Sequence, residues 1–216
     1  MPARRPRGPG LARGLYALGD MPVEIVPLTS EGFPDLAALF KEGGDPRWCW
    51  CQYWRLRSKD FAAEKVPELR ERLRDLADRD PAPGLVALDG DGPGARAVGW
   101  VSLGPRTDFE RIVRSRVIPT IDDRPVWSIV CFAVTRSARG TGIGSALLSA
   151  AIDYAAAHGA TTLEAYPVLP VKGTFNPDAA FTGTLPMFER AGFVVVADRA
   201  SDPSATFQRV VVRRDL

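Results

Sequence analysis

Arg139-Gly140-Thr141-Gly142-Ile143-Gly144-Ser145-Ala146-Leu147-Leu148 is the stretch of this chain that decides its fold. It follows an apolar, strand-like run at residues 126–134 and opens a helix that the apolar spacing predicts to continue to about residue 158. The first N–H groups of a helix have no partner within it, and the helix dipole leaves partial positive charge there. Glycine lets an anion approach the backbone closely, and Arg139 adds a permanent cation. The stretch therefore predicts a site for a phosphorylated cofactor.

Two known phosphate-binding patterns compete for this stretch. A P-loop needs a Lys-Ser/Thr pair after its last glycine, and none follows Gly144. The dinucleotide fingerprint Gly-x-Gly-x-x-Gly meets Ser145 at its third glycine, although Glu164 lies near the place where an acidic ribose ligand is expected. Because only one strand–helix–strand unit is visible, a nicotinamide-dependent oxidoreductase is kept as a minor alternative.

The pattern that fits best is Arg/Gln-x-x-Gly-x-Gly/Ala, which Arg139, Gly142 and Gly144 fill. With its apolar lead-in and the two leucines that follow, this segment resembles the central motif of the GCN5-related N-acetyltransferase (GNAT) family. Residues 188–193, Phe-Glu-Arg-Ala-Gly-Phe, resemble the second motif of that family, Tyr-Glu-Lys/Arg-x-Gly-Phe. The order of predicted elements resembles the family fold over nearly all of residues 22–213.

The resemblance implies an α/β (α+β) protein with the acyl-CoA N-acyltransferase fold. In that fold a mixed, mostly antiparallel central sheet of about six to seven strands contains one splayed pair and carries helices on both faces. From the sequence pattern we expect strands at residues 23–28, 85–88, 95–103, 126–134, 161–168, 193–197 and 205–212. We expect helices at residues 31–41, 60–79, 142–158 and 182–191, with a short helix within 108–117.

By resemblance, the cofactor is acetyl-CoA, used as a cosubstrate, and no metal is implied. The family holds the pyrophosphate on the glycine loop and pairs the pantetheine arm with backbone groups between the two splayed strands. A backbone N–H near Phe132 or Val134 would polarise the thioester carbonyl, as an oxyanion hole does. The cofactor-binding residues carried over in this way are Phe132, Ala133, Val134, Arg139, Gly140, Thr141, Gly142, Ile143, Gly144 and Ser145.

The resemblance also implies direct attack of an amine on the acetyl carbon in a ternary complex, which needs no enzyme nucleophile. Family members often protonate the departing thiolate with the tyrosine of the second motif, but this chain has Phe188 there. We expect Glu164 and Tyr166 to serve as base and acid, because residues two apart on a strand face the same side. Two alternatives stay open: a capping glutamate beside a core tyrosine, or a thiolate that leaves to solvent. The one histidine, His158, is expected only to stabilise the end of its helix.

An aromatic cluster, Trp-Cys-Trp-Cys-Gln-Tyr-Trp, occupies residues 48–54 between the first two predicted helices. The family builds its acceptor-binding wall in this region, and aromatic faces attract cations and apolar amines. We therefore expect Trp48, Trp50 and Tyr53 to bind the acceptor. The competing interpretation is that these rings only cover the core.

Charge is distributed unevenly along the 216 residues, whose formal net charge is +2. Residues 1–20 carry four arginines and one aspartate among prolines and glycines, so the rest of the chain is close to neutral. This composition has little to fold with and predicts a flexible basic tail at 1–20, followed by a single acetyltransferase domain at 21–216. A basic arm for nucleic acid is the less favoured interpretation. We take Met21 as the functional start and expect deletion of residues 1–20 to leave stability and acetyl-CoA affinity unchanged.

The three cysteines form no disulfide framework, which suits a reducing cytoplasm, and Cys49 and Cys51 lack the further ligands of a metal site. No apolar run is long enough for a membrane helix, and no signal peptide opens the chain. We expect a cytoplasmic enzyme whose partner is a small or peptidic primary amine, with no nucleic acid or membrane. The acceptor class and the oligomeric state, with a homodimer among the options, stay open. A non-catalytic acyl-CoA-binding sensor is the alternative function.

Overall fold

The protein is described here by a computed structural model that covers residues 14–18, 21–42, 46–90, 94–170, 181–198 and 207–216. Its strands are β1 (Gly14–Leu18), β2 (Met21–Pro27), β3 (Gly84–Asp89), β4 (Arg96–Pro105), β5 (Trp127–Val134), β6 (Thr162–Ala165), β7 (Val168–Pro170), β8 (Val194–Asp198) and β9 (Phe207–Asp215). Its α-helices are α1 (Phe33–Lys41), α2 (Pro46–Cys49), α3 (Ser58–Ala63), α4 (Val66–Asp75), α5 (Glu110–Val113), α6 (Ile143–Ala157) and α7 (Leu185–Arg190).

The strands form one mixed sheet in the order β1-β2-β3-β4-β5-β6-β9-β7, and β8 pairs with β9. Every neighbouring pair is antiparallel except β5 and β6, which run parallel. This topology confirms the predicted mixed, mostly antiparallel fold. The described sheet has nine strands rather than the expected six to seven. Two of the additional strands are β1 and β7, and β7 arises because the strand predicted at 161–168 is interrupted at Tyr166-Pro167.

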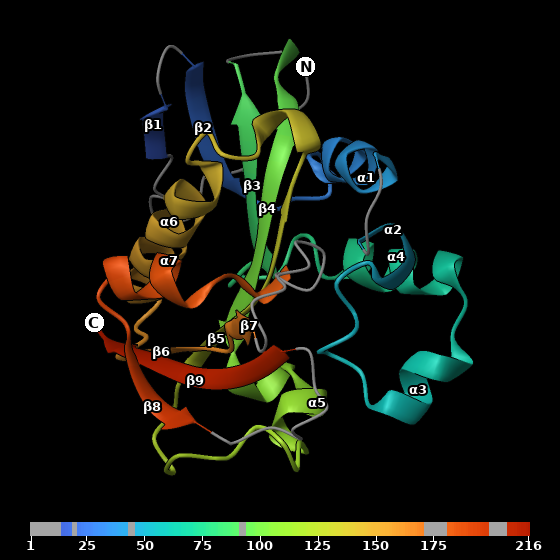
Figure 1. Ribbon diagram of the computed structural model, residues 1–216. Helices are drawn as coiled ribbons and strands as arrows, with labels where there is room; N and C mark the ends of the chain where they lie inside the picture. Colours follow the sequence, from blue (N-terminus) through green and yellow to red (C-terminus); the bar gives the residue numbers. More distant parts are fainter. Residues whose placement is uncertain (1–13, 19–20, 43–45, 91–93, 171–180, 199–206) are drawn as a thin grey trace.

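Helices cover both faces of the sheet, as predicted (Figure 1). Helices α6 and α7 lie on one face, and α1, α2 and α4 lie on the other. The side chains of β3 alternate between the two faces, so that Leu85 and Ala87 pack with the α6 layer while Val86 packs with the α1 layer. The sheet is therefore buried between two separate hydrophobic cores.

The position of α6 depends on a close approach to the sheet at Gly99 in β4. A Cβ atom at Gly99 would lie 2.8 Å from Ile143 and 2.9 Å from Leu147, closer than packed carbon atoms come. Glycine at this position lets the first turns of α6 lie directly on β4. The N-terminus of the helix is thereby held at the level of the end of β5.

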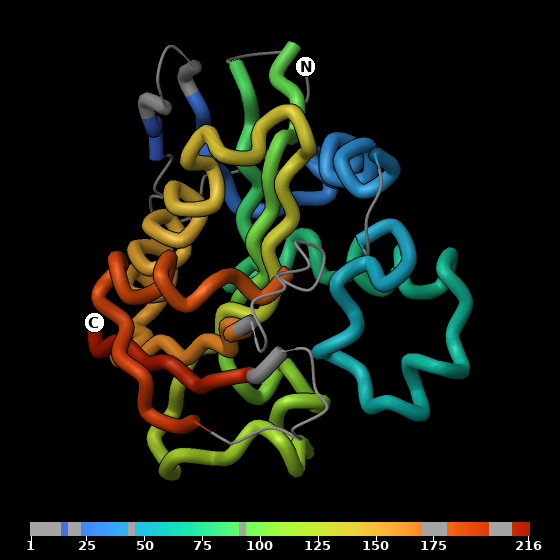
Figure 2. Tube along the Cα trace, viewed as in Figure 1, coloured from blue at the N-terminus to red at the C-terminus, as the bar shows by residue number. Residues whose placement is uncertain are grey.

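One predicted helix divides into two. The sequence pattern predicts a helix over 60–79, whereas the structure has α3 and α4 with an extended break at Glu64 and Lys65. Pro67 lies in the first turn of α4, where proline is favoured, whereas a helix continuing from α3 would lack the Pro67 N–H bond and would place its ring against the preceding turn. Figure 2 traces the resulting segment, which stands beside the sheet on the side away from α6.

The N-terminal prediction is corrected at Gly14–Leu18. These five residues form β1, which pairs antiparallel with β2 and extends the sheet by one strand. The ring of Tyr16 packs against the core beneath α6. The strand was not predicted because it follows a stretch rich in arginine and glycine. Its only strand signal is the short alternation in Gly-Leu-Tyr-Ala-Leu. Residues 1–13 and 19–20 of the predicted tail lie outside the described residues.

Candidate functional site

The sheet opens between its two parallel strands. β5 pairs with β6 only at Trp127–Leu163, Ser128–Glu164 and Ile129–Ala165, although β5 continues to Val134. In the described part of the chain, residues 130–134 of β5 therefore have no ladder partner on the β6 side, and Phe132, Ala133 and Val134 are partly exposed in the middle of a sheet. This opening is the predicted splayed pair.

A β-bulge lies where the opening begins. The register of β4 with β5 shifts between Ser102, opposite Cys131, and Leu103, opposite Ile129, so Val130 is an extra residue on β5. Bulges bend a strand and turn backbone groups out of the ladder. The bulge thus directs β5 away from β6 just as the last shared pair ends.

The glycine loop leads from the end of β5 into α6. Gly140 has φ 81° and Gly142 has φ 97°, and a side chain in this left-handed region is strained. Gly142 is the N-cap of α6, no side-chain hydrogen bond caps this end, and the first turn contains no acidic residue. Arg139, Gly140, Thr141, Gly142 and Ser145 are exposed, and Gly144 is partly so. The first N–H groups of α6 are therefore accessible to an anion.

These features fit the coenzyme that the loop pattern implies. A Cβ at Gly140 would meet no atom within 4 Å, so space lies open above the loop. Arg139 is exposed, and its Nε lies 3.4 Å from the Val134 carbonyl oxygen, which holds the guanidinium between the loop and the opening. Ile143 is buried in the core and can offer only its backbone. A diphosphate on this loop would have its chain directed toward the exposed residues of β5.

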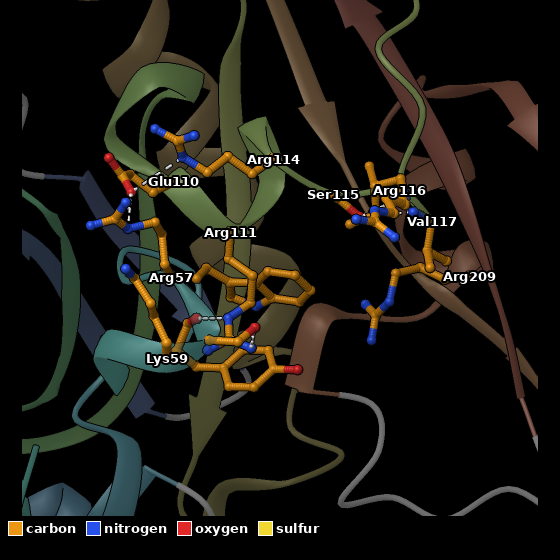
Figure 3. Close-up of a pocket in the computed structure, with 13 residues that line it drawn as sticks. Arg57, Lys59, Glu110, Arg111, Arg114, Ser115, Arg116, Val117 and Arg209 are labelled. Carbon is orange, nitrogen blue, oxygen red and sulfur yellow. Dashed lines mark hydrogen bonds and ion pairs between the residues drawn. The ribbon is translucent and has the colours of Figure 1, made fainter. Parts of the chain in front are cut away.

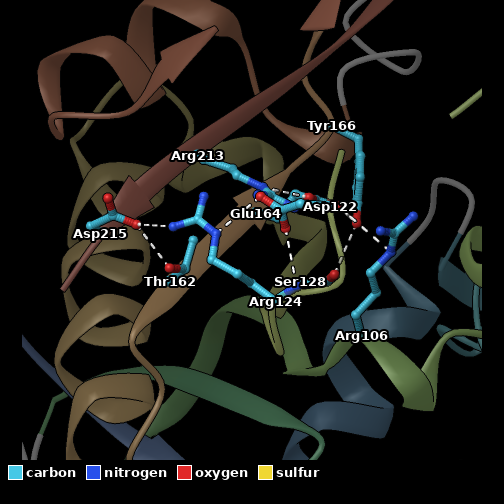
Figure 4. Close-up of polar contacts among 9 residues, drawn as sticks. All are labelled: Arg106, Asp122, Arg124, Ser128, Thr162, Glu164, Tyr166, Arg213 and Asp215. Atoms are coloured by element: carbon cyan, nitrogen blue, oxygen red, sulfur yellow. Dashed lines mark hydrogen bonds and ion pairs between the residues drawn. The ribbon is translucent and has the colours of Figure 1, made fainter. Parts of the chain in front are cut away.

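Glu164 and Tyr166 are brought together, as predicted, in a buried polar network (Figure 4). The Tyr166 hydroxyl donates to Glu164 Oε1 at 2.6 Å and lies 2.9 Å from Ser128 Oγ of β5. Arg213 of β9 donates from Nε to Glu164 Oε2 at 2.8 Å. Arg106 Nε lies 3.6 Å from Glu164 Oε1. The phenol is thus fixed at the last residue pairs before the strands separate.

This environment keeps the Tyr166 phenol neutral. Burial and the charge of Glu164 raise the pKa of Tyr166 well above its ordinary value. Both oxygens of Glu164 already accept hydrogen bonds, and its side chain is fully buried. A carboxylate held in this way is better placed to orient the phenol than to collect a proton from an incoming ammonium group.

Phe188 is a core residue. Its ring lies against Phe132 of β5 and Phe193, with centroids 6.1 and 5.1 Å apart, and it is fully buried. Phe188, which occupies the position of the second-motif tyrosine, therefore supports β5 at one side of the opening. His158 lies at the end of α6, where its Nδ1 is 2.7 Å from the Tyr154 carbonyl and its Nε2 is 3.1 Å from Asp80.

The three aromatic residues expected to bind an acceptor are separated by the fold. Trp50 is only 3% exposed and packs on Phe40 with centroids 5.4 Å apart, so it is a core residue and does not face an acceptor. Trp48 is 57% exposed, and the Arg47 guanidinium lies over its ring at 4.5 Å. Tyr53 is 37% exposed and lines a pocket. Of the three, Tyr53 alone lies at a concave site described in the structure.

That pocket has a volume of about 620 Å³ and brings residues from three distant segments together (Figure 3). Most of the pocket lining could not be predicted from the sequence, because the arginines of segment 104–125 occur there among acidic residues. The lining residues are Tyr53, Trp54, Arg57, Ser58, Lys59, Glu110, Arg111, Arg114, Ser115, Arg116, Val117, Ile118 and Arg209.

Among the described residues, no group of three or more His, Cys, Asp or Glu side chains could hold a metal ion. Cys49, Cys51 and Cys131 form no disulfide in the described part of the chain. No helix in the described ranges is long and apolar enough to cross a membrane.

The antiparallel topology overturns the nicotinamide alternative. A dinucleotide-binding domain needs successive parallel strand–helix–strand units, whereas β5 and β6 are the only parallel pair of strands in the described sheet. Glu164, the residue considered as a ribose ligand, is buried and engaged by Arg213.

Comparison with known proteins gives three results. The sequence model of the Acetyltransferase (GNAT) family matches residues 47–193. A search of curated proteins finds no match. Many solved structures share the fold, among them a GCN5-related N-acetyltransferase from Kribbella flavida, with 20% identity and a TM-score of 0.50 over 90% of this chain and 98% of that chain.

Two further structures illustrate the same likeness. PaiA N-acetyltransferase from Thermoplasma acidophilum, solved in complex with coenzyme A, has 14% identity and a TM-score of 0.50 over 90% of this chain and 99% of that chain. An acetyltransferase of the GNAT family from Streptococcus pneumoniae has 15% identity and a TM-score of 0.50 over 90% and 99% of the two chains. At these identities the likeness concerns the fold.

Proposed function

The chain belongs to the GNAT family of acetyltransferases, and from this premise we propose that it transfers the acetyl group of acetyl-CoA to a primary amine by direct attack in a ternary complex. The observation that carries the proposal is the opening between β5 and β6, which leads into an uncapped glycine loop at the start of α6. A diphosphate and a chain of amide groups fit these two neighbouring features together.

The binding roles follow from the local backbone. N–H groups of residues 140–145 would hold the diphosphate, with Arg139 as a cation beside it. Backbone groups of Phe132, Ala133 and Val134 would pair with the pantetheine arm, since the β6 side of these residues carries no strand in the described structure. Bound in this way, the coenzyme supplies an activated acyl group.

The acetyl group would come to rest near the bulge at Val130, because β5 begins to diverge there. A backbone N–H of β5 at this place would polarise the thioester carbonyl. The substrate ammonium first loses a proton to water, and the neutral amine nitrogen adds to the acetyl carbon. The carbon–sulfur bond then breaks, and the nitrogen releases its remaining extra proton to water. The sulfur then receives a proton.

We propose Tyr166 as the donor of that proton. Its hydroxyl lies beside Ser128, one pair before the opening, and its raised pKa keeps it protonated. Glu164 and Arg213 would act as positioning residues that hold the phenol in place. This arrangement would take the place of the second-motif tyrosine, whose position Phe188 occupies.

Heat protection by coenzyme A tests the binding half of the proposal. A ligand at 100 times its dissociation constant stabilises the folded state by about 2.7 kcal/mol, which is readily seen as a rise in melting temperature. The test of transfer is release of free thiol from acetyl-CoA in the presence of a broad panel of amines. Protection by NAD but not by coenzyme A would contradict the proposal, and protection without thiol release from any amine would favour a non-catalytic sensor.

A further inference from the structure

The pocket lined by Tyr53, Arg111 and Arg209 is strongly basic. Six of its thirteen lining residues are arginine or lysine, whereas one, Glu110, is acidic. Figure 3 shows Arg57, Arg111 and Arg114 on one side of the pocket and Arg209 on the other. Its volume of about 620 Å³ suits a small molecule, because ligand pockets usually span about 300–1,000 Å³.

The pocket adjoins the place proposed for acetyl transfer. Trp54, which forms part of its wall, faces the ring of Tyr166 with centroids 6.5 Å apart. Arg209 donates from Nη1 to the Tyr166 carbonyl at 2.8 Å. The pocket is built on the α1 side of the sheet, opposite α6 and the glycine loop. A molecule in it would approach the opening from the face that the coenzyme does not use.

Two of the arginines are held in place without a carboxylate. Arg111 lies over Tyr53 at 4.0 Å and donates to Ser58 Oγ at 2.9 Å. Arg209 lies over Trp54 at 5.3 Å and donates to Thr182 Oγ1 at 2.9 Å. No carboxylate of the described residues forms an ion pair with either. Both guanidinium groups are thus oriented by aromatic rings and neutral oxygens.

The acidic side chains near the pocket already have cationic partners. Glu110 lies 3.3 Å from Arg57 and 3.6 Å from Arg114. Asp108 of the same segment is turned away to Arg55 and Arg79, at 3.2 and 3.1 Å. Neither Glu110 nor Asp108 therefore forms an ion pair with Arg111 or Arg209.

The burial of Arg209 points to the same conclusion. Burial lowers the pKa of Arg209 from its ordinary value to about 10, as desolvation does to a cation that lacks a counter-charge. An anion bound beside Arg209 and Arg111 would supply that counter-charge.

We propose that the acetyl acceptor is a small amine that also carries an anionic group, a carboxylate or a phosphate, and that Arg111 and Arg209 bind that group. This inference rests on the proposed acetyl transfer and narrows the acceptor. Guanidinium groups suit either anion, because their planar donors match pairs of oxygens. Polyamines and aminoglycosides, which carry several positive charges, would be repelled by the same residues.

Matched acceptors test the proposal through kcat/KM for thiol release. Phenylalanine is compared with phenylalaninamide, and phosphoethanolamine with ethanolamine, with spermidine as the polycation. We expect at least one anionic member to exceed its neutral partner by about 10-fold or more, and the pair that shows this preference identifies the anion. The amide has the less basic amine and hence more of the reactive neutral form, which works against the expected result.

Charge variants link that preference to the two arginines. R209Q and R111Q should each raise KM for the anionic acceptor about 10-fold or more and leave KM for acetyl-CoA unchanged. R209K retains the charge and should recover part of the loss. R96Q is the control, since Arg96 lies outside the pocket in an exposed ion pair with Glu42. Coenzyme A protection shows that each variant folds.

A binding measurement decides the matter if none of these amines reacts. With coenzyme A present, phenyl phosphate or benzoate should raise the melting temperature of the wild type and R96Q, but not that of R209Q or R111Q. Equal response of all four proteins, no response of any, or turnover that favours the neutral or polycationic amines would overturn the proposal. Those outcomes leave acetyl transfer intact, which fails if coenzyme A gives no protection or if no amine of the broad panel releases thiol.

Discussion

Gly142 has two roles: it adopts the backbone conformation that starts α6, and it leaves the helix N–H groups open to a ligand. It is the N-cap of α6 with φ 97°, a conformation that costs other residues roughly 1–2 kcal/mol. We expect Gly142→Val to lose about that much stability and to abolish the rise in melting temperature caused by coenzyme A, because a side chain would cover the helix N–H groups. Thermal melts with and without coenzyme A measure both effects.

Gly159→Val provides the matched control, since Gly159 has φ 78° at the other end of α6 and open space around it. This variant should lose similar stability yet retain the full response to coenzyme A. Loss of the response in both variants would mean that strain, not the loop, explains the effect.

Tyr166 is the residue on which the proposed proton transfer depends. We expect Tyr166→Phe to lower kcat by about 10²-fold, in the range typical of general acid catalysis, with KM for acetyl-CoA unchanged. Since its pKa is raised well above 10, the wild-type rate should show no loss of the acid as pH rises toward 10. The pH–rate profiles of both proteins check this.

The control for Tyr166 is Tyr154→Phe, which removes another buried hydroxyl, one that accepts a hydrogen bond from the Ala82 N–H on the α6 side of the sheet. It should alter stability and leave kcat near the wild-type value. An unchanged kcat in Tyr166→Phe would instead indicate that the thiolate leaves to solvent without a protein acid.

At the scale of single residues, a site can be predicted from the sequence when all the groups that form it are close together in the chain. The glycine loop could be recognised because positive φ, open N–H groups and an adjacent arginine all occur within a few residues. The roles of the residues in the aromatic cluster could not be predicted in this way. Trp50 faces the core and Tyr53 is partly exposed because of the tertiary fold, which the local sequence does not show. Arg209 carries no sequence signal at all, since its role depends on rings contributed by Trp54 and Phe181.

Among the elements, β1 has the clearest measurable consequence. It covers the edge of β2, and Tyr16 packs on the core under α6. We expect a protein that starts at Met21 to be less stable than one that starts at Gly14 by about 1–2 kcal/mol, or roughly 2–8 °C in melting temperature. Its affinity for coenzyme A should be the same, because β1 is remote in the sheet order from β5 and β6. Equal melting temperatures would support the simpler view of an inert tail.

The segment between α5 and β5 is attached to β9 by an ion pair with a definite pH dependence. Arg213 donates to Asp122 Oδ2 at 2.7 Å, and this bond lowers the pKa of Asp122 from 3.8 to about 2. A depressed carboxyl pKa stabilises the fold above the unfolded value and ceases to do so as pH falls through the folded value. We therefore expect melting temperature to decline between about pH 4 and pH 2.

Asp122→Asn should be less stable than the wild type at pH 7 and should show a weaker decline over that interval. Glu42→Gln, which breaks an exposed ion pair with Arg96, serves as the control and should keep the wild-type pH dependence. Parallel curves for Asp122→Asn and the wild type would show that Asp122 is not responsible.

Element types were largely predictable, and their ends were not. The helix at 142–158 and the strand at 126–134 have long apolar patterns, the helix bounded by Gly142 and Gly159 and the strand preceded by Pro125, and the structure has α6 and β5 there. The interruption between β6 and β7 occurs at Pro167. Its effect on strand pairing depends on the residues of β9 that lie opposite, which the local sequence does not show. The prediction of one helix over 60–79 did not treat Pro67 as the signal for the start of a second helix.

On the scale of the whole molecule, the two proposed substrates approach from opposite faces of the sheet. The glycine loop lies on the α6 side and the basic pocket on the α1 side. Both can then be bound at once, and initial-rate plots with varied acetyl-CoA and amine should intersect. Parallel lines would indicate an acyl-enzyme, for which Cys131 on β5 is the nucleophile to examine by Cys131→Ala.

The basic character of the pocket is likewise a property of the whole fold. Segment 104–125 carries both signs of charge in sequence, and no rule of spacing shows which residues will be matched. Folding delivers Asp108 to Arg55 and Asp122 to Arg213, and thereby leaves arginines facing the pocket. The selectivity proposed for the acceptor would thus arise from the pairing of the acidic residues with other arginines.

The parting of β5 from β6 gives this protein a free strand border in its interior, where most sheets have none. In the described structure, three residue pairs join β5 to β6 there, and the Ser128–Tyr166 contact reinforces them. A coenzyme whose amides lie along that border would act as a temporary extra strand and make the two halves of the sheet fold and unfold as one. The protein would then be most rigid when both substrates are bound and most flexible after the products have left.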